Sequence, residues 1–279
     1  MTAGSMTEPQ KATSGASDWG MSPWRVRYRR LEPALLGTSC LVLFLALWQV
    51  GSDAHWLDPT FVSSPWAVAK ELGHYIPTSQ FVADLRYTGL TFLYGLALSL
   101  VVGLVLGVAM GLIKRVRWFF DYFFSLLYAS PRIALIPLFV LWFGIGRNTG
   151  IAMVFLLAVF PIMINTTSGV QHVDETLVEM ARSQKATRLQ LMRTVILPGS
   201  LPQIISGIRL AIGNALIGVV VAEFLAGSTS GLGYRMQLAS QNFQTAQVFA
   251  GLVVISALGL ILTQLLKIVE RYFQRWRTA

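Results

Sequence analysis

The chain has 279 residues, of which 54% are hydrophobic and only 13% charged, and its mean hydropathy is +0.59. Soluble globular domains carry about 25% charged residues, so this composition indicates a membrane protein. The net charge of +9 does not indicate nucleic-acid binding, because the 22 Lys and Arg residues lie between apolar runs and form no basic face with interleaved aromatics. The single cysteine, Cys40, cannot form a disulfide within one chain and supports no cysteine-based metal site.

Residues 1–33 are polar, rich in Ser, Thr and Gly, and end in a cluster of four arginines, Arg25, Arg27, Arg29 and Arg30. This pattern predicts a flexible cytoplasmic tail that ends in an anchor, with no fold before about Trp24. A cleavable signal peptide is the alternative, because "SDA" at 52–54 faintly resembles a cleavage site. The long polar lead and an apolar run that can span a membrane favour the tail.

Six apolar stretches are long enough to cross a bilayer, which requires about 20 residues in a helix. They are 34–51, 88–113, 118–143, 149–168, 201–226 and 248–267. The third contains Pro131, Arg132 and Pro137, and we expect one kinked span there instead of two half-spans. The predicted fold class is therefore an all-α integral membrane protein with six transmembrane helices, its transmembrane domain covering residues 34–279.

Basic residues set the predicted orientation, because they are retained on the cytoplasmic side of a membrane. With both termini cytoplasmic, most of the 22 basic residues fall in the tail, in the 114–117 and 170–199 loops, and after the last span. Segments 51–86 and 228–247 are then outside. The orientation predicts that 170–199 forms the one long cytoplasmic loop.

Small residues recur every four positions along the second span, at Gly95, Ser99, Gly103, Gly107 and Gly111. Such a stripe lets helices approach closely in a bilayer. It predicts packing within one subunit in preference to a dimer seam. A second glycine-rich stretch, "GSTSGLG" at 227–233, lacks the Lys of a phosphate-binding loop and is interpreted as a turn or gating loop.

The cytoplasmic loop contains "VEMARSQKATRLQLMRTVILPG" at 178–199. From Asp174 to Leu197 it has an acidic start and basic later turns, which predicts a short helix, a bend and a second helix. Several apolar positions could face either the membrane surface or a partner protein. They are Leu177, Met180 and Ala181, then Leu189, Leu191 or Met192, and Val195. Periodicity does not choose between these two surfaces.

This loop resembles the EAA motif of permease subunits in binding-protein-dependent ABC importers. Glu179 and Ala181 fall on the Glu-Ala-Ala positions of that motif, and Leu197 and Pro198 on its Leu-Pro. Met180 replaces the middle Ala, and Lys185 replaces a Gly. Gly would permit a left-handed bend without steric cost, whereas a residue with a side chain in that conformation costs about 1 kcal/mol. The ATPase-coupling residues that the resemblance implies are Glu179, Met180, Ala181, Lys185, Leu197 and Pro198.

Further stretches between about 60 and 270 resemble the nitrate, sulfonate and taurine branch of these importers. They are "IPLFVLWFGIGRNTG" (136–150), "FPIMINTTSGV" (160–170), "LPGSLPQIISGIRLAIGNA" (197–215) and "VVAEFLAGSTSGLGYRMQ" (220–237). The branch often carries a Pro-rich stretch entering the third span, where this chain has residues 128–132 with the sequence "YASPR". Because of this departure, the substrate contacts of the branch are not transferred to residues of this chain.

The resemblance implies a type I ABC importer permease-like bundle in a bacterial inner membrane. Two permease copies form the translocation path, two cytoplasmic ATPase subunits drive it, and an extracytoplasmic binding protein delivers the substrate. The chain has no phosphate-binding G-x-x-x-x-G-K-[ST] motif, so ATP hydrolysis is expected on the separate subunit and this chain is not expected to be an enzyme. The expected substrate is a small anion such as nitrate, a sulfonate or taurine.

Two alternatives are a permease for a heteroaromatic vitamin precursor and, in a different class, a secondary transporter. A proton-driven secondary transporter would favour intramembrane acids, and the predicted spans contain few. No catalytic, cofactor or metal site is expected, because His55, His74 and His172 are scattered without zinc-site spacing. The implied contacts are the ATPase, the binding protein, a second permease copy and membrane lipid, with no nucleic acid.

Polar residues inside the predicted spans are candidates for the translocation path or a gate, because buried charges in a membrane face protein or water. Arg209 and Glu223 lie 14 residues apart on the fifth span, about 21 Å along a helix, which is too far for an ion pair. A structural role is favoured for Arg209, and an outer gate for Glu223. The candidates are Arg132, Asn165, Arg209, Asn214 and Glu223.

Overall fold

The computed structural model describes residues 23–58 and 60–274, with side chains from 35 to 271, and divides the chain into two compact units at Leu57–Asp58. The first unit contains helix α1, Pro23–Asp53, of which Leu35–Asp53 is long and apolar enough to cross a membrane. Residues 23–33, expected in the tail, are helical. The rest of the predicted tail lies outside the described residues.

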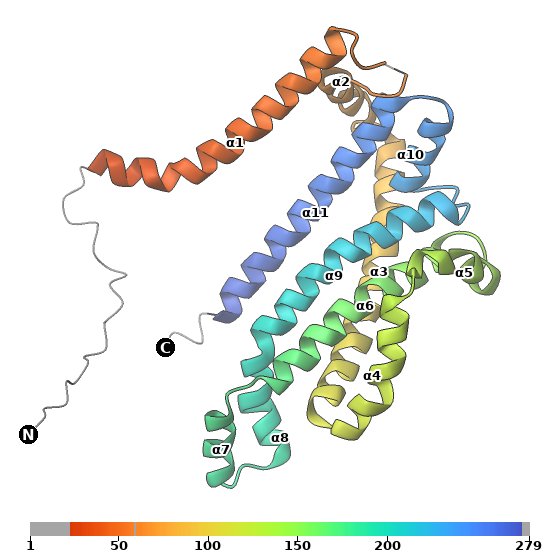
Figure 1. The fold of residues 1–279 in the computed structure, drawn as a ribbon. Coiled ribbons are helices and arrows are strands. Elements are labelled where there is room, and N and C mark those ends of the chain that lie inside the picture. Colours follow the sequence, from red (N-terminus) through yellow and green to blue (C-terminus); the bar gives the residue numbers. More distant parts are fainter. Residues whose placement is uncertain (1–22, 59, 275–279) are drawn as a thin grey trace, which may run out of the picture. The chain divides into compact units, whose positions relative to one another are not determined.

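The second unit is a bundle of helices (Figure 1). Within the residues that the structure describes, all regular structure is helical, as the sequence predicts. In chain order the elements are α2 (Pro65–Tyr75), α3 (Ser79–Leu112), α4 (Lys114–Ala129), the 3-10 turn η1 (Arg132–Leu135), α5 (Ile136–Phe143), α6 (Arg147–Gln171), α7 (Glu175–Ser183), α8 (Arg188–Leu191), the π turn η2 (Met192–Ile196), α9 (Leu197–Leu225), α10 (Leu232–Gln241) and α11 (Thr245–Gln274).

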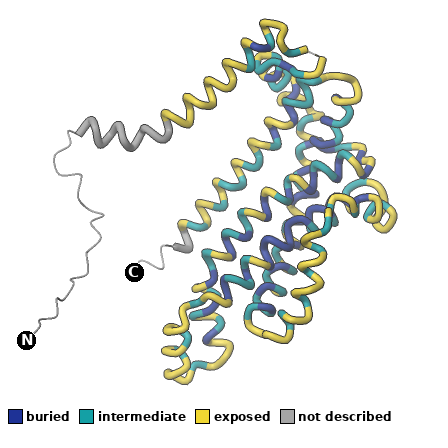
Figure 2. The backbone as a smooth tube through the Cα atoms, in the orientation of Figure 1, coloured by how far each residue is buried: buried dark blue, intermediate teal, exposed yellow. Residues whose placement is uncertain are grey.

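Helix α6 is the central helix of the bundle and packs against both α3 and α9. Two thirds of its apolar window is buried, more than in any other candidate span of the described chain (Figure 2). Its core residues Val154, Ala158 and Ile162 are fully buried and pack against Ala211 and Ala215 of α9. An apolar helix that is buried on most sides is typical of the centre of a membrane bundle.

The glycine stripe of α3 is the seam with α6. A Cβ atom added at Gly95 would lie 2.5 Å from Val154, and one added at Gly107 would lie 2.6 Å from Thr166. Gly103 and Gly111 meet Ile162 and Val170 in the same way. The prediction of packing within one subunit is therefore confirmed.

The third predicted span is broken instead of kinked. Lys114–Ala129 and Arg132–Phe143 meet at 93°, because Ser130 is extended and Pro131 cannot continue a helix. Of the described helices, five are long and apolar enough to cross a membrane, and six if this bent pair is counted as one span.

Candidate functional site

The short helices of the second unit lie at two opposite ends of the bundle, α7 and α8 at one end and α2 and α10 at the other (Figure 1). The α7 end consists of residues 172–200 and contains α7, α8 and the π turn. The α10 end consists of α2, the first turns of α3 and residues 223–241. The two ends use their carboxylates differently.

Helix α7 is delimited by side-chain caps. The Asp174 carboxylate accepts a hydrogen bond of 2.8 Å from the N–H of Thr176 and so satisfies one open donor of the first turn. The second helix begins in the same way, because Thr187 and Gln190 form a reciprocal capping box. The predicted pattern of a short helix, a bend and a second helix is therefore confirmed.

The bend between the two helices is left-handed and is made by Lys185, whose φ is +57°. The N–H of Ala186 donates to the carbonyl of Ala181 (3.1 Å), and the N–H of Lys185 donates to the carbonyl of Arg182 (2.9 Å). This pair of bonds is the Schellman arrangement that usually has glycine at the left-handed position. Lys185 thus adopts the conformation that the motif glycine would adopt.

The two faces of α7 have different surroundings. Val178 and Ala181 pack inward against Leu191 and Ile196. On the other side Leu177 is 50% and Met180 55% exposed, and Glu179 is also exposed. Within the part of the chain that the structure describes, Glu179 forms no ion pair or hydrogen bond through its side chain. Of the apolar positions whose surface the sequence leaves open, Ala181, Leu191 and Val195 therefore belong to the interior of the loop.

The sequence predicts that the second helix of the loop ends at Leu197 and Pro198. In the structure these two residues instead form the first turn of α9. The N–H of Leu197 bonds to the carbonyl of Met192, five residues back, which widens the helix into a π turn. Proline is tolerated at the first helical positions because its missing N–H is not needed there. The helical run therefore continues from Arg188 to Leu225.

At the α10 end, Asp84 is completely buried and accepts hydrogen bonds from four directions. Tyr75 donates its hydroxyl at 2.9 Å, Arg235 its Nε at 3.1 Å, and the N–H of Gly231 lies 3.1 Å from the other carboxylate oxygen. Gln80 adds a bond of 3.1 Å. Burial, together with the hydrogen bond to Asp84, raises the pKa of Tyr75 above its usual range, so this hydroxyl remains a donor.

Glu223 lies beside Asp84 and is 1% exposed. The Thr88 hydroxyl lies 2.8 Å from one of its carboxylate oxygens, and the N–H of Gly233 donates to the other at 2.7 Å. The hydroxyl of Thr88 in turn accepts a bond of 2.9 Å from the N–H of Leu232. The N-terminus of α10 therefore points at two carboxylates, which satisfies its open N–H groups and matches the positive end of its dipole.

The stretch 227–233 is a turn that is held by these carboxylates. Gly231 has a φ of +117°, and a Cβ atom there would lie 2.5 Å from the Glu223 carboxylate. Glycine is therefore required both by the backbone conformation and by the space. The backbone N–H groups of this turn face acids of the same chain, which is the opposite of what a phosphate-binding loop offers.

The remaining predicted path residues are dispersed. Arg132 begins the 3-10 turn at the break, and its guanidinium lies 4.9 Å from the Tyr128 ring and 5.4 Å from the Phe160 ring. Its buried Nη1 atom has no hydrogen-bond partner. Asn214 lies half-buried on α9, with no hydrogen bond through its side chain among the described residues.

Two other candidates are engaged within the bundle. Asn165 donates to the carbonyl of Pro161 (2.8 Å) and packs against Gly207 of α9. Arg209 forms an ion pair with Glu270 of α11, so it does not pair with Glu223, in agreement with their separation along α9. These contacts tie helices to one another.

The sequence did not single out Asp84, Thr88, Tyr75 or Arg235. Asp84 and Arg235 are 151 residues apart in the chain, and Thr88 and Glu223 are 135 apart. Asp84 also falls before the predicted start of the second span at 88. The only available signal was the glycine-rich turn beside Glu223.

The comparisons with known proteins agree with the fold. The family described as binding-protein-dependent transport system inner membrane component matches residues 99–275. A putative aliphatic sulfonates transport permease protein SsuC of Bacillus subtilis is 34% identical and aligns over 92% of this chain and 91% of its own. The formylaminopyrimidine transport permease protein ThiX of Halalkalibacterium halodurans is 32% identical over 90% of this chain and 97% of its own.

A solved structure of the MetNI methionine ABC transporter in an inward-facing conformation has the same fold, with a TM-score of 0.58 at 17% identity. The match covers 75% of this chain and 97% of that one. The resemblance noted in the cytoplasmic loop is thus matched over most of the chain. The chain belongs to the inner-membrane permease components of binding-protein-dependent transport systems.

Proposed function

We propose that two copies of this chain form the translocation path of an ATP-driven importer for a small anion, such as a sulfonate, taurine or nitrate. Helix α7 of each copy docks on one of two ATPase subunits. The α7 end faces the cytoplasm, and the α10 end faces the binding protein outside. A permease belongs to the inner membrane and is not itself catalytic, so the ATPase supplies the chemical energy.

The observation that carries this proposal is the outward face of α7. Leu177 and Met180 form an exposed apolar patch, and Glu179 between them has no partner in the described chain. A helix that only lay on lipid would have basic residues around a broad apolar face, with no need for an acid at this position. The face is instead suited to a groove in another protein.

Glu179 is the residue that we expect to fix this docking. It lies near the middle of α7, where the helix dipole contributes little because its effect falls off beyond the first turn. Its carboxylate is therefore available to a donor on the ATPase. Lys185 and the Schellman bend hold α7 at a fixed angle to α8, which continues into α9. Movement of α7 is then transmitted to the spans.

The anion assignment is supported by Arg132. Its guanidinium stacks on two aromatic rings at the break of the third span, and its buried Nη1 lacks a protein acceptor. A buried guanidinium N–H without an acceptor is costly, and an anion that reached it would supply one. The sulfonate relative agrees with an anion, whereas the formylaminopyrimidine relative favours the heteroaromatic alternative. Uptake of each solute class with the matching binding protein distinguishes the two.

The test of the docking assignment is Glu179→Ala. Losing one side of an interfacial charge pair costs about 2–5 kcal/mol, so the variant should insert normally but lose ATPase co-purification and uptake. Glu71→Ala on α2, at the opposite end of the bundle, is the matched control and should retain the ATPase. Wild-type uptake by Glu179→Ala with the ATPase bound would remove this residue from the interface.

Stoichiometry and orientation can be measured on the same preparation. The mass of the detergent-solubilised complex should correspond to two permeases and two ATPases, and an active one-to-one complex would contradict the proposal. In a Cys40→Ala background, single cysteines at Ser79 and Ser240 should react with an impermeant reagent in intact cells. A cysteine at Ser183 should not react, and labelling there would reverse the orientation.

A further inference from the structure

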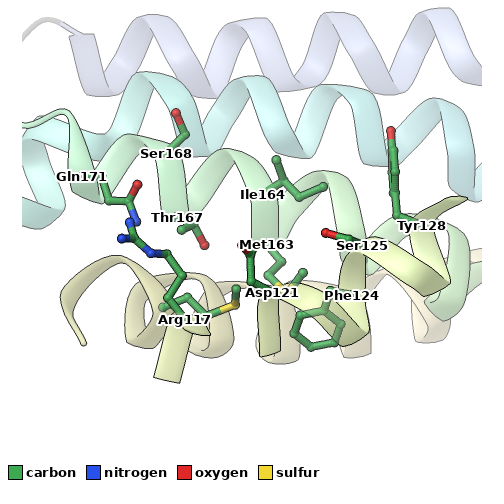
Figure 3. A pocket seen from close by; sticks show the side chains of 11 residues that line it. Arg117, Asp121, Phe124, Ser125, Tyr128, Met163, Ile164, Thr167, Ser168 and Gln171 are labelled. Atoms are coloured by element: carbon green, nitrogen blue, oxygen red, sulfur yellow. The ribbon is translucent and has the colours of Figure 1, made fainter. Parts of the chain in front are cut away.

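A pocket of about 280 Å³ lies between α4 and the second half of α6 (Figure 3). It is near the lower limit of small-molecule sites, which are roughly 300–1,000 Å³. Its lining combines apolar side chains, among them Met110, Phe124 and Met163, with polar ones. None of the residues of the outward α7 face or of the α10 end lines it.

One wall of the pocket consists of polar side chains that are spaced one helical turn apart along α4. Arg117, Asp121 and Ser125 line it, at positions i, i+4 and i+8. Residues four apart lie on the same face of a helix, with their Cβ atoms about 5–6 Å apart. A cationic, an anionic and a hydroxyl group therefore line one side in that order.

These groups are not used within the protein. Across the described part of the chain, Arg117 and Asp121 form no ion pair with each other or with another residue, and Ser125 makes no side-chain hydrogen bond. Opposite charges one turn apart on a helix are close enough to pair. In this structure they are separated, and Figure 3 shows Arg117 reaching from α4 toward Gln171 at the end of α6, with Asp121 nearer the middle of the pocket.

The opposite wall, on α6, adds acceptors and amide donors. Thr167 lines the pocket and donates its hydroxyl to the carbonyl of Gly107 (3.1 Å), so the oxygen lone pairs remain available. Gln171 contributes a side-chain amide beside the Arg117 guanidinium (Figure 3). The Arg117 side of the pocket is therefore suited to an oxyanion, and the Asp121–Thr167 side to an ammonium group.

We propose that this pocket binds a small zwitterionic group that carries both an oxyanion and a primary ammonium. Arg117 and Gln171 bind the oxyanion, and Asp121 and Thr167 bind the ammonium. Asp121 has a second effect, because its charge repels a solute that carries only an anion. The pocket thus discriminates between zwitterions and simple anions by charge.

This chemistry has two sources. One is a soluble aminosulfonate such as taurine, and the other is the headgroup of phosphatidylethanolamine in the surrounding membrane. Both present an oxyanion and an ammonium with a two-carbon spacer. The lipid composition of the membrane separates them.

The experiment measures binding of radiolabelled taurine to the permease–ATPase complex in nanodiscs of phosphatidylglycerol, with and without phosphatidylethanolamine. Arg117→Gln and Asp121→Asn should each weaken the binding about tenfold or more, because each removes a charge-assisted hydrogen bond. Arg115→Gln, on the same helix but not lining the pocket, is the control and should leave binding unchanged. Asp121→Asn should also strengthen binding of ethanesulfonate, which lacks the ammonium.

The opposite response to the two solutes separates this site from a folding defect, because a misfolded variant loses both. Taurine binding that persists in phosphatidylethanolamine discs identifies a soluble occupant. Binding that the lipid abolishes identifies the headgroup, as does ethanolamine lipid that co-purifies with the wild type but not with Arg117→Gln. The site is overturned if taurine binding is not saturable and no ethanolamine lipid is retained. It is also overturned if both variants bind taurine as the wild type does. ATPase docking by α7 is measured separately and does not depend on this result.

Discussion

The α10 end and the α7 end of the bundle both contain carboxylates, but they obtain their donors from different places. Asp84 and Glu223 at the α10 end are 0% and 1% exposed, and their bonds come from side chains and backbone of the same chain. Glu179 at the α7 end is exposed and has no donor within the described residues. One end is completed by its own sequence, and the other is available to a second protein.

This difference follows from the cost of burying charge. A buried carboxylate without partners is strongly destabilising, and Asp84 here has four donor groups and Glu223 two. An exposed acid remains hydrated and has no such cost, so Glu179 is stable without a donor from its own chain. The α10 end is therefore expected to move as one body with α3 and α9, whereas the outward face of α7 is expected to gain its donors only when the ATPase binds.

Asp84→Ala is the change that should break the α10 end most severely. It leaves Arg235, Tyr75 and the N–H of Gly231 without their acceptor in a buried site. Removing one partner of a buried ion pair costs about 3–5 kcal/mol, which is a large fraction of the stability of a domain. Thermal unfolding of the purified permease in detergent should show a clear fall in midpoint and yield.

Asp58→Asn is the control for this measurement, because Asp58 is exposed and makes only a local bond of 2.8 Å to the N–H of Thr60. It should unfold close to the wild type. An Asp84→Ala protein as stable as Asp58→Asn would mean that the α10 end is not held by its own carboxylates.

Local features of the α7 end could be predicted from the sequence, because each depends on neighbouring residues. The acidic cap, the later basic turn and the bend all lie within residues 174–191. The family pattern raised the question of Lys185, and the structure shows that it takes the left-handed conformation itself. The sequence does not predict that Leu197 and Pro198 begin α9, because the π turn before them leaves no periodic signal.

The α10 end could not be predicted in the same way. Asp84 meets Arg235 across 151 residues, and Thr88 meets Glu223 across 135. No local rule brings such pairs together, and only the packing of α3 with α9 and α10 does so. The same limit applies to the pocket, since the polar stripe of α4 acquires meaning only when α6 closes the other wall.

The α3–α6 seam joins the two ends, and Gly107→Ala should loosen it. The added Cβ would lie 2.6 Å from the Cβ of Thr166 and 2.9 Å from the carbonyl of Met163, so the helices must separate. Such overpacking costs about 1–3 kcal/mol. Gly89→Ala in the same helix has nothing within 4 Å and should be neutral or stabilising by about 0.5–1 kcal/mol. Thermal unfolding of both variants tests the seam, and equal midpoints would contradict the close approach.

Lys185→Gly should sharpen the α7 end by stabilising its bend. Lys185 occupies a left-handed conformation that costs about 1 kcal/mol for a residue with a Cβ, and glycine removes this cost. Hydrogen exchange of the 175–191 amides should therefore slow by several-fold. Lys185→Ala keeps the Cβ and should show no such gain, so equal protection in the two variants would argue against backbone strain.

Arg209 of α9 forms an ion pair with Glu270 near the end of α11. Variants of this pair test whether charges nearer the α7 end also bind groups of the same chain. Arg209 and Glu270 are 39% and 22% exposed, so screening limits their coupling to about 0.2–1 kcal/mol. A double-mutant cycle with Arg209→Gln and Glu270→Gln measures this term free of the other contacts of Glu270. If the pair is structural, each single variant should reduce thermal stability slightly and leave uptake near the wild-type rate. Loss of uptake in Arg209→Gln but not in Glu270→Gln would place Arg209 on the solute path. The charges that are satisfied within the chain would then be those of the α10 end and would not include Arg209.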